Sequence, residues 1–270
     1  MEIENKIPKS CKVVVIGGGV AGCSTAYHLA KYGWKDTVLL ERDVLTSGTT
    51  WHAAGLIGQL GSSATITKLR NYSLNLYKRL EEETGLSTGL KQNGSLTVAT
   101  TLDRLEELKR QLTFAQRFDI EARQVSNEEI KEIYPLINTE DLVGGVFINK
   151  DGQADPVGVT SVMAKAARQN GATIIEKCPV KKILTKNNKI VGVETNYGKI
   201  ECEYVVLATG MWSRQIAKEI DVSIPLYPDE HFYVLSEPIA DIDRSLPVLR
   251  DYNNCLYLKE DAGKLLVGVF

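Results

Sequence analysis

The first forty residues alternate between apolar runs and an amphipathic stretch in a regular order. Val13, Val14, Val15 and Ile16 form a continuous apolar run, which predicts a short buried strand. Residues 23–31 carry apolar side chains at helical spacing, and 37–40 form a second apolar run. A strand, a helix and a second strand in this order predict a βαβ unit with parallel strands.

Further along the chain, hydrophobic periodicity predicts additional helices and strands. The predicted helices span 62–83, 102–118, 157–170 and 211–220, with a short one from 126, and the strands span 95–100, 144–148, 173–176, 179–185, 190–195 and 204–208. After residue 224, four prolines separate strand-like pieces at 231–235, 255–259 and 264–270. The last piece ends without a turn or a polar tail, so we expect the chain to be a portion of a longer protein.

The composition narrows the possible functions. The chain has 270 residues, of which 43% are hydrophobic, and its formal net charge is −2. This charge gives no electrostatic footprint for nucleic acid, and no apolar run reaches the length of a membrane span. Five scattered cysteines form no C-x-x-C pair, three histidines show no metal-ligand spacing, and the first ten residues lack a secretory signal. We therefore expect a cytoplasmic location, with neither nucleic acid nor a membrane as a partner.

Three glycines between the first strand and the helix fit the spacing G-x-G-x-x-G. Gly17 permits a tight turn, Gly19 lets the backbone approach a pyrophosphate, and Gly22 lets the helix pack close to the sheet. The N-terminus of the helix that follows offers N–H groups and a partial positive charge to phosphate. The motif in this context predicts a dinucleotide site.

Glu41 ends the second strand, 19 residues after Gly22. A carboxylate at this place accepts hydrogen bonds from ribose hydroxyls and disfavours a 2′-phosphate. The predicted ligand is therefore an adenosine dinucleotide other than NADP. The alternative is a glycine-rich turn in another kind of α/β protein, which the matching strand, helix and acidic residue disfavour.

Residues 46–55 differ from their surroundings, because small and hydroxyl side chains there flank a single Trp51-His52 pair. Such a segment lets the backbone come close to a ligand. It also follows the second strand, where a cofactor lying across the carboxyl edge of the sheet would pass. The spacing alone fits equally well a loop with a packed tryptophan.

Two motifs together resemble the two-part flavin fold of the D-amino-acid oxidase superfamily: the glycine motif with Glu41, and Tyr-Val-Val-Leu-Ala-Thr-Gly at 204–210. Within this superfamily, 47–55 closely resembles the dimethylglycine and sarcosine dehydrogenases, as do 246–251 and 265–268. The resemblance implies an α/β fold, with a Rossmann-like FAD-binding domain and an interleaved mixed-sheet α+β substrate domain. It places the FAD-binding parts at 1–85 and 152–222 and the substrate parts at 86–151 and 223–270, the last of them truncated.

The resemblance implies FAD as the cofactor, joined covalently through His52 to a methyl carbon of the flavin ring. It places two side chains at the substrate, His231 and Tyr257. From residue types alone, both are more often ordinary strand residues. The residues expected to contact FAD are Gly17, Gly19, Val20, Ala21, Gly22, Glu41, Arg42, Ser47, Thr49, Thr50, Trp51, His52, Ala54, Gly55, Val180, Thr209, Gly210 and Trp212.

The activity implied is oxidation of an N-methyl amino acid, such as dimethylglycine or sarcosine, by hydride transfer from the N-methyl carbon to the flavin. The acceptor of the electrons would be an electron-transfer flavoprotein, or oxygen in an oxidase. Tetrahydrofolate would take part only if a C-terminal folate-binding domain exists. Two alternatives remain: a binding module like the family's non-catalytic phosphatase regulatory relative, and an oxidase of another amine.

Overall fold

The computed structural model describes residues 7–269, which form two compact units. Each unit is assembled from three separate segments of the chain, so the path crosses between them repeatedly. The first unit takes the described part of Met1–Ala53, Tyr77–Thr88 and Asp155–Asp229; the second takes Ala54–Leu76, Gly89–Ala154 and the described part of Glu230–Phe270. The functional boundaries expected at residues 85, 151 and 222 stay a prediction.

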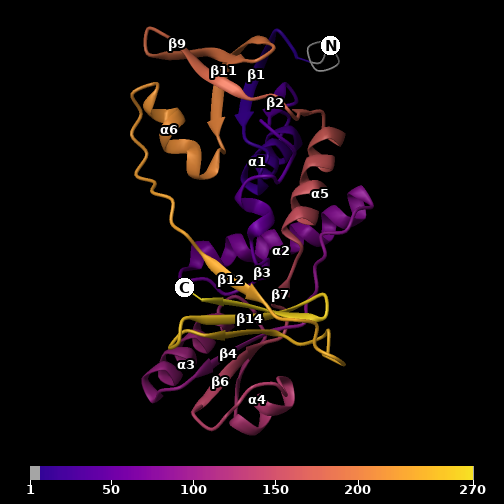
Figure 1. Ribbon diagram of the computed structural model, residues 1–270, viewed down its shortest axis with the longest axis vertical. Helices are drawn as coiled ribbons and strands as arrows, with labels where there is room; N and C mark the ends of the chain where they lie inside the picture. The colour runs from indigo at the N-terminus through magenta and orange to yellow at the C-terminus, as the bar shows by residue number, and fades with distance from the viewer. Residues whose placement is uncertain (1–6, 270) are drawn as a thin grey trace. The chain divides into compact units, whose positions relative to one another are not determined.

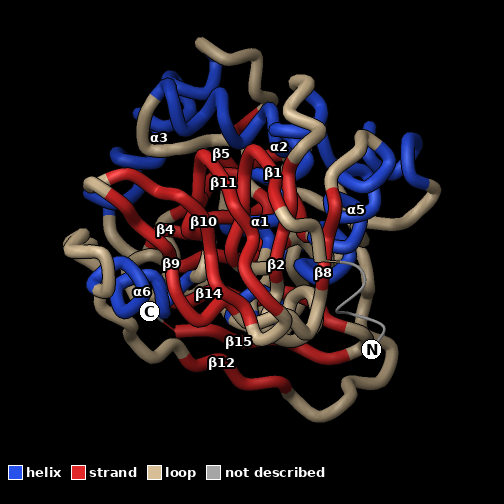
Figure 2. Tube along the Cα trace, turned by 90° about the horizontal axis from the view of Figure 1, so that it is seen from above, coloured by secondary structure: helices blue, strands red, loops and turns tan. Residues whose placement is uncertain are grey.

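The first unit contains a six-stranded sheet in the order β8-β2-β1-β11-β10-β9, which Figure 2 shows from one edge to the other. The first four strands of this order run parallel to one another, and β10 and β9 extend the sheet through antiparallel pairs. Their bounds are Thr173–Ile175 (β8), Thr37–Leu40 (β2), Ser10–Ile16 (β1), Gly198–Leu207 (β11), Lys189–Thr195 (β10) and Val180–Lys186 (β9). The strands bury branched aliphatic side chains, which include Val14, Val38, Ile183 and Ile200.

Two helices lie side by side in this unit, α1 (Val20–Lys31) and α5 (Pro156–Gln169) (Figure 1). Both bury alanines, which allow close packing between elements. The start of α5 is fixed locally, because the Asp155 carboxylate accepts hydrogen bonds from the N–H groups of Val157 and Gly158. The unit also holds two 3-10 turns, η2 (Thr49–His52) and η3 (Gly210–Trp212), and α6 (Ser213–Lys218).

The second unit is built on a seven-stranded sheet in the order β12-β15-β14-β13-β4-β6-β5. Its strand pairs are antiparallel except for β13 and β4, which are parallel, so the sheet is mixed. The bounds are Phe232–Leu235 (β12), Lys264–Val269 (β15), Leu256–Asp261 (β14), Val248–Asp251 (β13), Ser95–Ala99 (β4), Gly144–Ile148 (β6) and Ala122–Val125 (β5). A small second sheet pairs β3 (Leu56–Ile57) with β7 (Gly152–Gln153).

Helices cover both faces of this sheet. Ile130 of α4 (Asn127–Ile133) packs with Leu96 and Val98 on one face. Leu108 of α3 (Leu102–Gln116) packs with Val146, which lies opposite Thr97 and therefore on the other face. The longest helix, α2 (Ala64–Thr84), passes from the second unit into the first.

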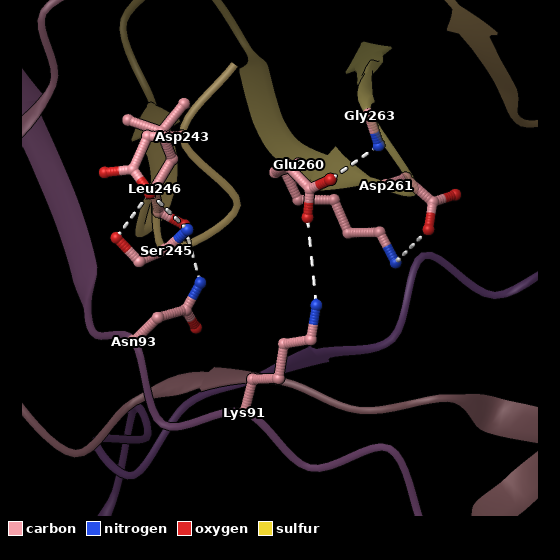
Figure 3. Close-up of polar contacts among 9 residues, drawn as sticks. Lys91, Asn93, Asp243, Ser245, Leu246, Glu260, Asp261 and Gly263 are labelled. Atoms are coloured by element: carbon pink, nitrogen blue, oxygen red, sulfur yellow. Dashed lines mark hydrogen bonds and ion pairs between the residues drawn. The ribbon is translucent and has the colours of Figure 1, made fainter. Parts of the chain in front are cut away.

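A group of polar contacts fastens the end of the β14–β15 hairpin to the chain around residue 91 (Figure 3). The buried Glu260 carboxylate accepts a hydrogen bond of 2.7 Å from the Gly263 N–H, and the Lys91 ammonium lies 3.9 Å from its other oxygen. The amide of Asn93 donates to the Leu246 carbonyl. Glu260 is therefore held by a backbone N–H and by a lysine.

The fold prediction, an α/β chain with an interleaved mixed-sheet part, is confirmed. Several element predictions are wrong in detail. The strand predicted at 204–208 is the end of a longer strand, β11, whose first half pairs antiparallel with β10. The strands β3, β5, β7 and β13 were not predicted. The helix expected from Cys23 begins at Val20, and the one expected over 211–220 is η3 followed by the short α6.

Candidate functional site

A pocket of about 570 Å³ lies in the first unit, at the carboxyl ends of β1, β2 and β11. This is the edge at which open parallel sheets bind ligands, and the volume lies within the range of small-molecule sites. The lining residues are Ile16, Gly17, Gly18, Gly19, Val20, Ala21, Leu40, Glu41, Arg42, Gly48, Thr49, Thr50, Pro179, Val180, Leu207, Ala208, Thr209, Gly210, Trp212, Gln215 and Ile216.

The glycine motif forms the turn from β1 into α1 as the sequence predicts. Gly17 has a φ of +109°, which L side chains rarely adopt, and its N–H donates to the Leu40 carbonyl. A Cβ on Gly22 would overlap the Gly17 carbonyl oxygen, so only glycine permits this approach of the helix. The turn therefore depends on backbone geometry and on the lack of side chains.

The N-terminus of α1 forms part of the pocket wall. Its N-cap residue is Gly19, which offers no side-chain hydrogen bond, and the Val20 N–H donates to the Thr50 hydroxyl at 3.0 Å. A Cβ on Gly19 would meet this same hydroxyl oxygen at 2.9 Å. A helix start whose N-cap residue is a glycine lets a phosphate group approach the backbone closely.

Glu41 is nearly buried at the end of β2, and both of its carboxylate oxygens accept backbone hydrogen bonds. Oε2 accepts from the Gly18 N–H at 2.6 Å, and Oε1 accepts from the Asp43 N–H at 2.9 Å. These bonds fix the carboxylate at the pocket wall while leaving further lone pairs on each oxygen. The fixed carboxylate is therefore able to accept bonds from hydroxyl groups of a ligand.

Arg42 and Trp212 form a second wall of the pocket. The Arg42 guanidinium carbon lies 3.9 Å from the centre of the Trp212 ring, which is a cation–π contact. Nearby, the Thr209 and Ser213 hydroxyls lie 2.9 Å apart and share a hydrogen bond. The pocket thus offers a charged, stacked surface in addition to the backbone turn of Gly17.

Twelve of the predicted FAD-contact residues line this pocket: Gly17, Gly19, Val20, Ala21, Glu41, Arg42, Thr49, Thr50, Val180, Thr209, Gly210 and Trp212. Gly22 lies within α1, one position after the lining residue Ala21. Ser47 is exposed, and Ala54 and Gly55 belong to the second unit. The lining residues that the sequence analysis missed include the apolar strand ends Ile16, Leu40 and Leu207, Gly18 of the glycine turn, and Gln215 and Ile216 of α6.

His52 and Trp51 lie in η2, outside the lining of the pocket. Both side chains are exposed, and their rings stack with centres 3.9 Å apart. An exposed imidazole is accessible to a reactive partner, whereas a histidine packed in the core is not. Because Trp51 is exposed, its interpretation as a packed residue is wrong. The covalent role of His52 stays a prediction.

The other two predicted residues belong to the seven-stranded sheet of the second unit. His231 is exposed and directly precedes β12, and Tyr257 is the second residue of β14. Strand register pairs Tyr233 with Gly268, Gly268 with Tyr257, and Tyr257 with Arg250. Residues paired in this way point to the same face of a sheet. Tyr233, Tyr257 and Arg250 therefore form one row across four strands.

The ring of Tyr257 lies over Gly268, since a Cβ built on that glycine would overlap the ring. Partial burial raises the pKa of Tyr257, and the neighbouring Tyr233 raises it further. The hydroxyl of Tyr257 therefore stays protonated at neutral pH and remains a donor. The row also includes Gly268 and Arg250, which the sequence analysis did not single out as site residues.

Among residues 7–269, no three His, Cys, Asp or Glu side chains gather as a metal site requires. The helices of the same range include none that is both long and apolar enough to cross a bilayer. All five cysteines are free thiols.

The model of the family described as "FAD dependent oxidoreductase" matches residues 12–270. Human mitochondrial sarcosine dehydrogenase is 41% identical over 268 residues, which cover 97% of this chain and 29% of the relative. Human mitochondrial dimethylglycine dehydrogenase is 38% identical, over 100% of this chain and 32% of the relative. The mouse mitochondrial pyruvate dehydrogenase phosphatase regulatory subunit is also 38% identical, over 98% of this chain and 30% of the relative. The chain thus spans about a third of the length of these relatives.

Among solved structures, L-proline dehydrogenase from P. horikoshii is similar to this chain, with a TM-score of 0.89 and 30% sequence identity. The match covers 97% of this chain and 70% of that protein. The likeness extends over the residues of both units.

Proposed function

The chain belongs to the family of FAD dependent oxidoreductases, and from this premise we propose that it takes part in the oxidation of an N-methyl amino acid, such as sarcosine or dimethylglycine. The observation that carries the proposal is the pocket of the first unit, whose glycine turn, helix N-terminus and Glu41 suit the adenosine diphosphate part of FAD. Support for the substrate class comes from the 41% identity to sarcosine dehydrogenase.

Each part of the pocket has a proposed task. The N–H groups at the start of α1 hold the pyrophosphate, and the Glu41 carboxylate accepts hydrogen bonds from the ribose. The Arg42–Trp212 pair covers the nucleotide from the other side. His52, exposed in η2, forms the covalent link to the flavin, which prevents loss of the cofactor. FAD, when bound, accepts a hydride from the substrate.

In the substrate reaction, the neutral amine loses a hydride from its N-methyl carbon and becomes an iminium ion. Water adds to the iminium, and formaldehyde and the demethylated amine leave. We assign His231 and Tyr257 to orienting the amine and influencing its proton. The electrons then pass to an electron-transfer flavoprotein or to oxygen. Tetrahydrofolate would capture the one-carbon unit only where a folate-binding domain accompanies this chain.

The experiment that tests the proposal is anaerobic reduction of the flavin-loaded protein. We expect sarcosine or dimethylglycine to bleach the flavin absorbance, and His231→Asn to slow the bleaching while flavin stays bound. Bleaching at an unchanged rate in the variant would remove His231 from the mechanism. Absence of bleaching with every N-methyl amino acid would contradict the enzymatic proposal.

A second candidate is a binding module without redox activity, favoured by the 38% identity to a phosphatase regulatory subunit. Flavin fluorescence of the denatured protein on a gel separates the two candidates partly. A fluorescent band that is lost in His52→Ala supports the covalent link and the dehydrogenase. A protein that neither retains flavin nor is reduced by an amine supports the binding module.

The cellular location is proposed on the chemistry of the thiols. Cys11 and Cys202 face each other in register on β1 and β11 as free thiols, and burial raises the pKa of Cys11 to about 12 and that of Cys202 to about 11. Free thiols are typical of a reducing compartment. We propose the cytoplasm; the names of three similar proteins contain the word "mitochondrial", and fractionation would decide between the two locations.

A further inference from the structure

A single hydroxyl group joins the turn that carries His52 to the start of α1. The N–H of Val20, the first residue of α1, donates to the Thr50 hydroxyl at 3.0 Å. Within residues 7–269, no other hydrogen bond connects η2 with a helix or a strand. The chain before η2 is tied separately, because the Thr46 N–H donates to the Gly18 carbonyl. The placement of η2 itself therefore depends on Thr50.

The four residues of η2 divide into two pairs with different surroundings. Thr49 and Thr50 line the pocket, as Val20 does, and Thr50 is half-buried. Trp51 and His52 are exposed and lie outside the lining. All four belong to one short 3-10 turn, so a group that fixes the first pair against α1 also fixes the backbone of the second pair.

The imidazole of His52 relies on this backbone for its place. Its ring stacks on the Trp51 ring, with centres 3.9 Å apart. In the described part of the chain, no hydrogen bond or ion pair holds the ring. Since Trp51 belongs to the same turn, the stack orients the imidazole relative to η2 but does not fix η2 to the rest of the unit. That connection comes from Thr50.

From this arrangement we infer that Thr50 is a positioning residue: its hydroxyl holds η2 on α1 and thereby places His52 for attachment to the flavin. The inference rests on the proposed function, in which His52 forms the covalent link. Attachment breaks a C–H bond of the ring methyl group and the N–H bond of the imidazole, and it forms one C–N bond. The two electrons pass to the flavin ring and then to oxygen, which takes up the two protons and becomes hydrogen peroxide.

The test measures how fast flavin becomes attached when FAD is saturating. Thr50→Val keeps the shape of the side chain and removes the hydroxyl, whereas Thr50→Ser keeps the hydroxyl. Each protein is prepared without flavin and mixed with excess FAD in air, and the flavin fluorescence of the denatured protein band is followed with time. We expect Thr50→Val to slow attachment by about 10- to 100-fold, because a nucleophile displaced by about 1 Å loses about that much rate. Thr50→Ser should stay within about threefold of the unaltered protein.

A second measurement separates placement of His52 from binding of FAD. The Kd for FAD is measured in His52→Ala, where no attachment occurs, with and without Thr50→Val. We expect the two Kd values to agree within about threefold, because loss of the hydroxyl leaves the Val20 N–H free for a phosphate oxygen. The matched control is Thr25→Val, which removes a hydroxyl that donates to the Ala21 carbonyl within α1. It should change neither the rate nor the Kd.

The outcomes that overturn the inference differ from one another. Attachment at the unaltered rate in Thr50→Val would remove Thr50 from the placement of His52, and a weaker Kd in the same variant would then assign the hydroxyl to binding of FAD alone. Equal slowing by Thr50→Ser would show that the hydroxyl is not the group responsible. Equal slowing by Thr25→Val would reduce the result to a general effect on α1.

The unaltered protein distinguishes failure of this inference from failure of the proposed function. If it attaches flavin as fast as Thr50→Val does, only the role of Thr50 is lost. If its denatured band never becomes fluorescent, the covalent link through His52 falls, and the inference falls with it. Anaerobic reduction of the bound FAD by sarcosine then still decides whether the protein oxidises an N-methyl amino acid.

Discussion

The pocket of the first unit and the row on the seven-stranded sheet are built in different ways. One wall of the pocket is made by consecutive residues, namely the end of β1, the Gly17 turn and the start of α1, with Glu41 from the next strand. The row is made by single residues of separate strands, Tyr233, Tyr257 and Arg250, which only register brings together. A backbone site tolerates almost no added atoms, whereas a row of side chains can change specificity one residue at a time.

The largest effect is expected where the backbone itself makes the site. Gly22→Ala places a Cβ against the Gly17 carbonyl oxygen, so α1 must move away from the turn. We expect a loss of about 2–3 kcal/mol in the free energy of unfolding and at least a 100-fold weaker affinity for FAD. Denaturant unfolding and a fluorescence titration with FAD measure the two quantities.

Gly33→Ala is the control for this substitution. It adds a Cβ in open space at a turn where φ is +93°, so it should cost only the strain of that conformation, about 1 kcal/mol. Its affinity for FAD should equal that of the unaltered protein. An unaltered FAD affinity in Gly22→Ala would show that the pocket does not depend on the close approach of the helix.

A smaller effect is expected on the side-chain row. Gly268→Ala places a Cβ where the Tyr257 ring lies, so the ring must turn away from its position over β15. We expect reduction by sarcosine to slow by about 10- to 100-fold, because a misplaced orienting group costs rate, while FAD affinity stays unchanged. Anaerobic stopped-flow reduction and the FAD titration separate these effects. Tyr257→Phe, which keeps the ring in place, shows how much of the loss belongs to the hydroxyl.

The smallest effect concerns the pH dependence of stability at Asp151. Burial raises its pKa in the folded state, so the folded protein keeps the proton to a higher pH than the unfolded chain does. Stability is therefore full below the ordinary aspartate pKa and falls as the pH rises through the folded pKa. Asp151→Asn keeps the shape of the group and removes this titration. The free energy of unfolding of the variant should therefore fall less steeply with rising pH than that of the unaltered protein. If the free energy of unfolding changes with pH in the same way for both proteins from acid to neutral pH, the assignment is contradicted.

The sequence made the pocket predictable because its signal is local. The apolar run at 13–16, the spacing of Gly17, Gly19 and Gly22, and Glu41 all lie within one short segment. Each residue follows from the geometry of the βαβ turn. The apolar lining of Leu207 and Ile216 carried no chemical signal of its own, so these positions needed the structure.

The row was much less predictable, because β12 pairs with β15 and not with β13, the next strand along the chain. β13 is four residues long and ends in Arg250 and Asp251, so it lacks the apolar run of a typical buried strand. The first half of β11 was missed although its sequence carried the signal: Lys199, Glu201 and Glu203 alternate with Ile200 and Cys202, which is the period of two of a half-buried strand.

The central claim is that the chain serves oxidation at an N-methyl carbon. The products formed from sarcosine under anaerobic conditions test this most directly, with one equivalent of flavin-loaded protein. Oxidation at the N-methyl carbon predicts one formaldehyde and one glycine for each flavin reduced. Glyoxylate and methylamine would instead show oxidation at the α-carbon, and flavin that stays oxidised would contradict the assignment of an amine-oxidising activity.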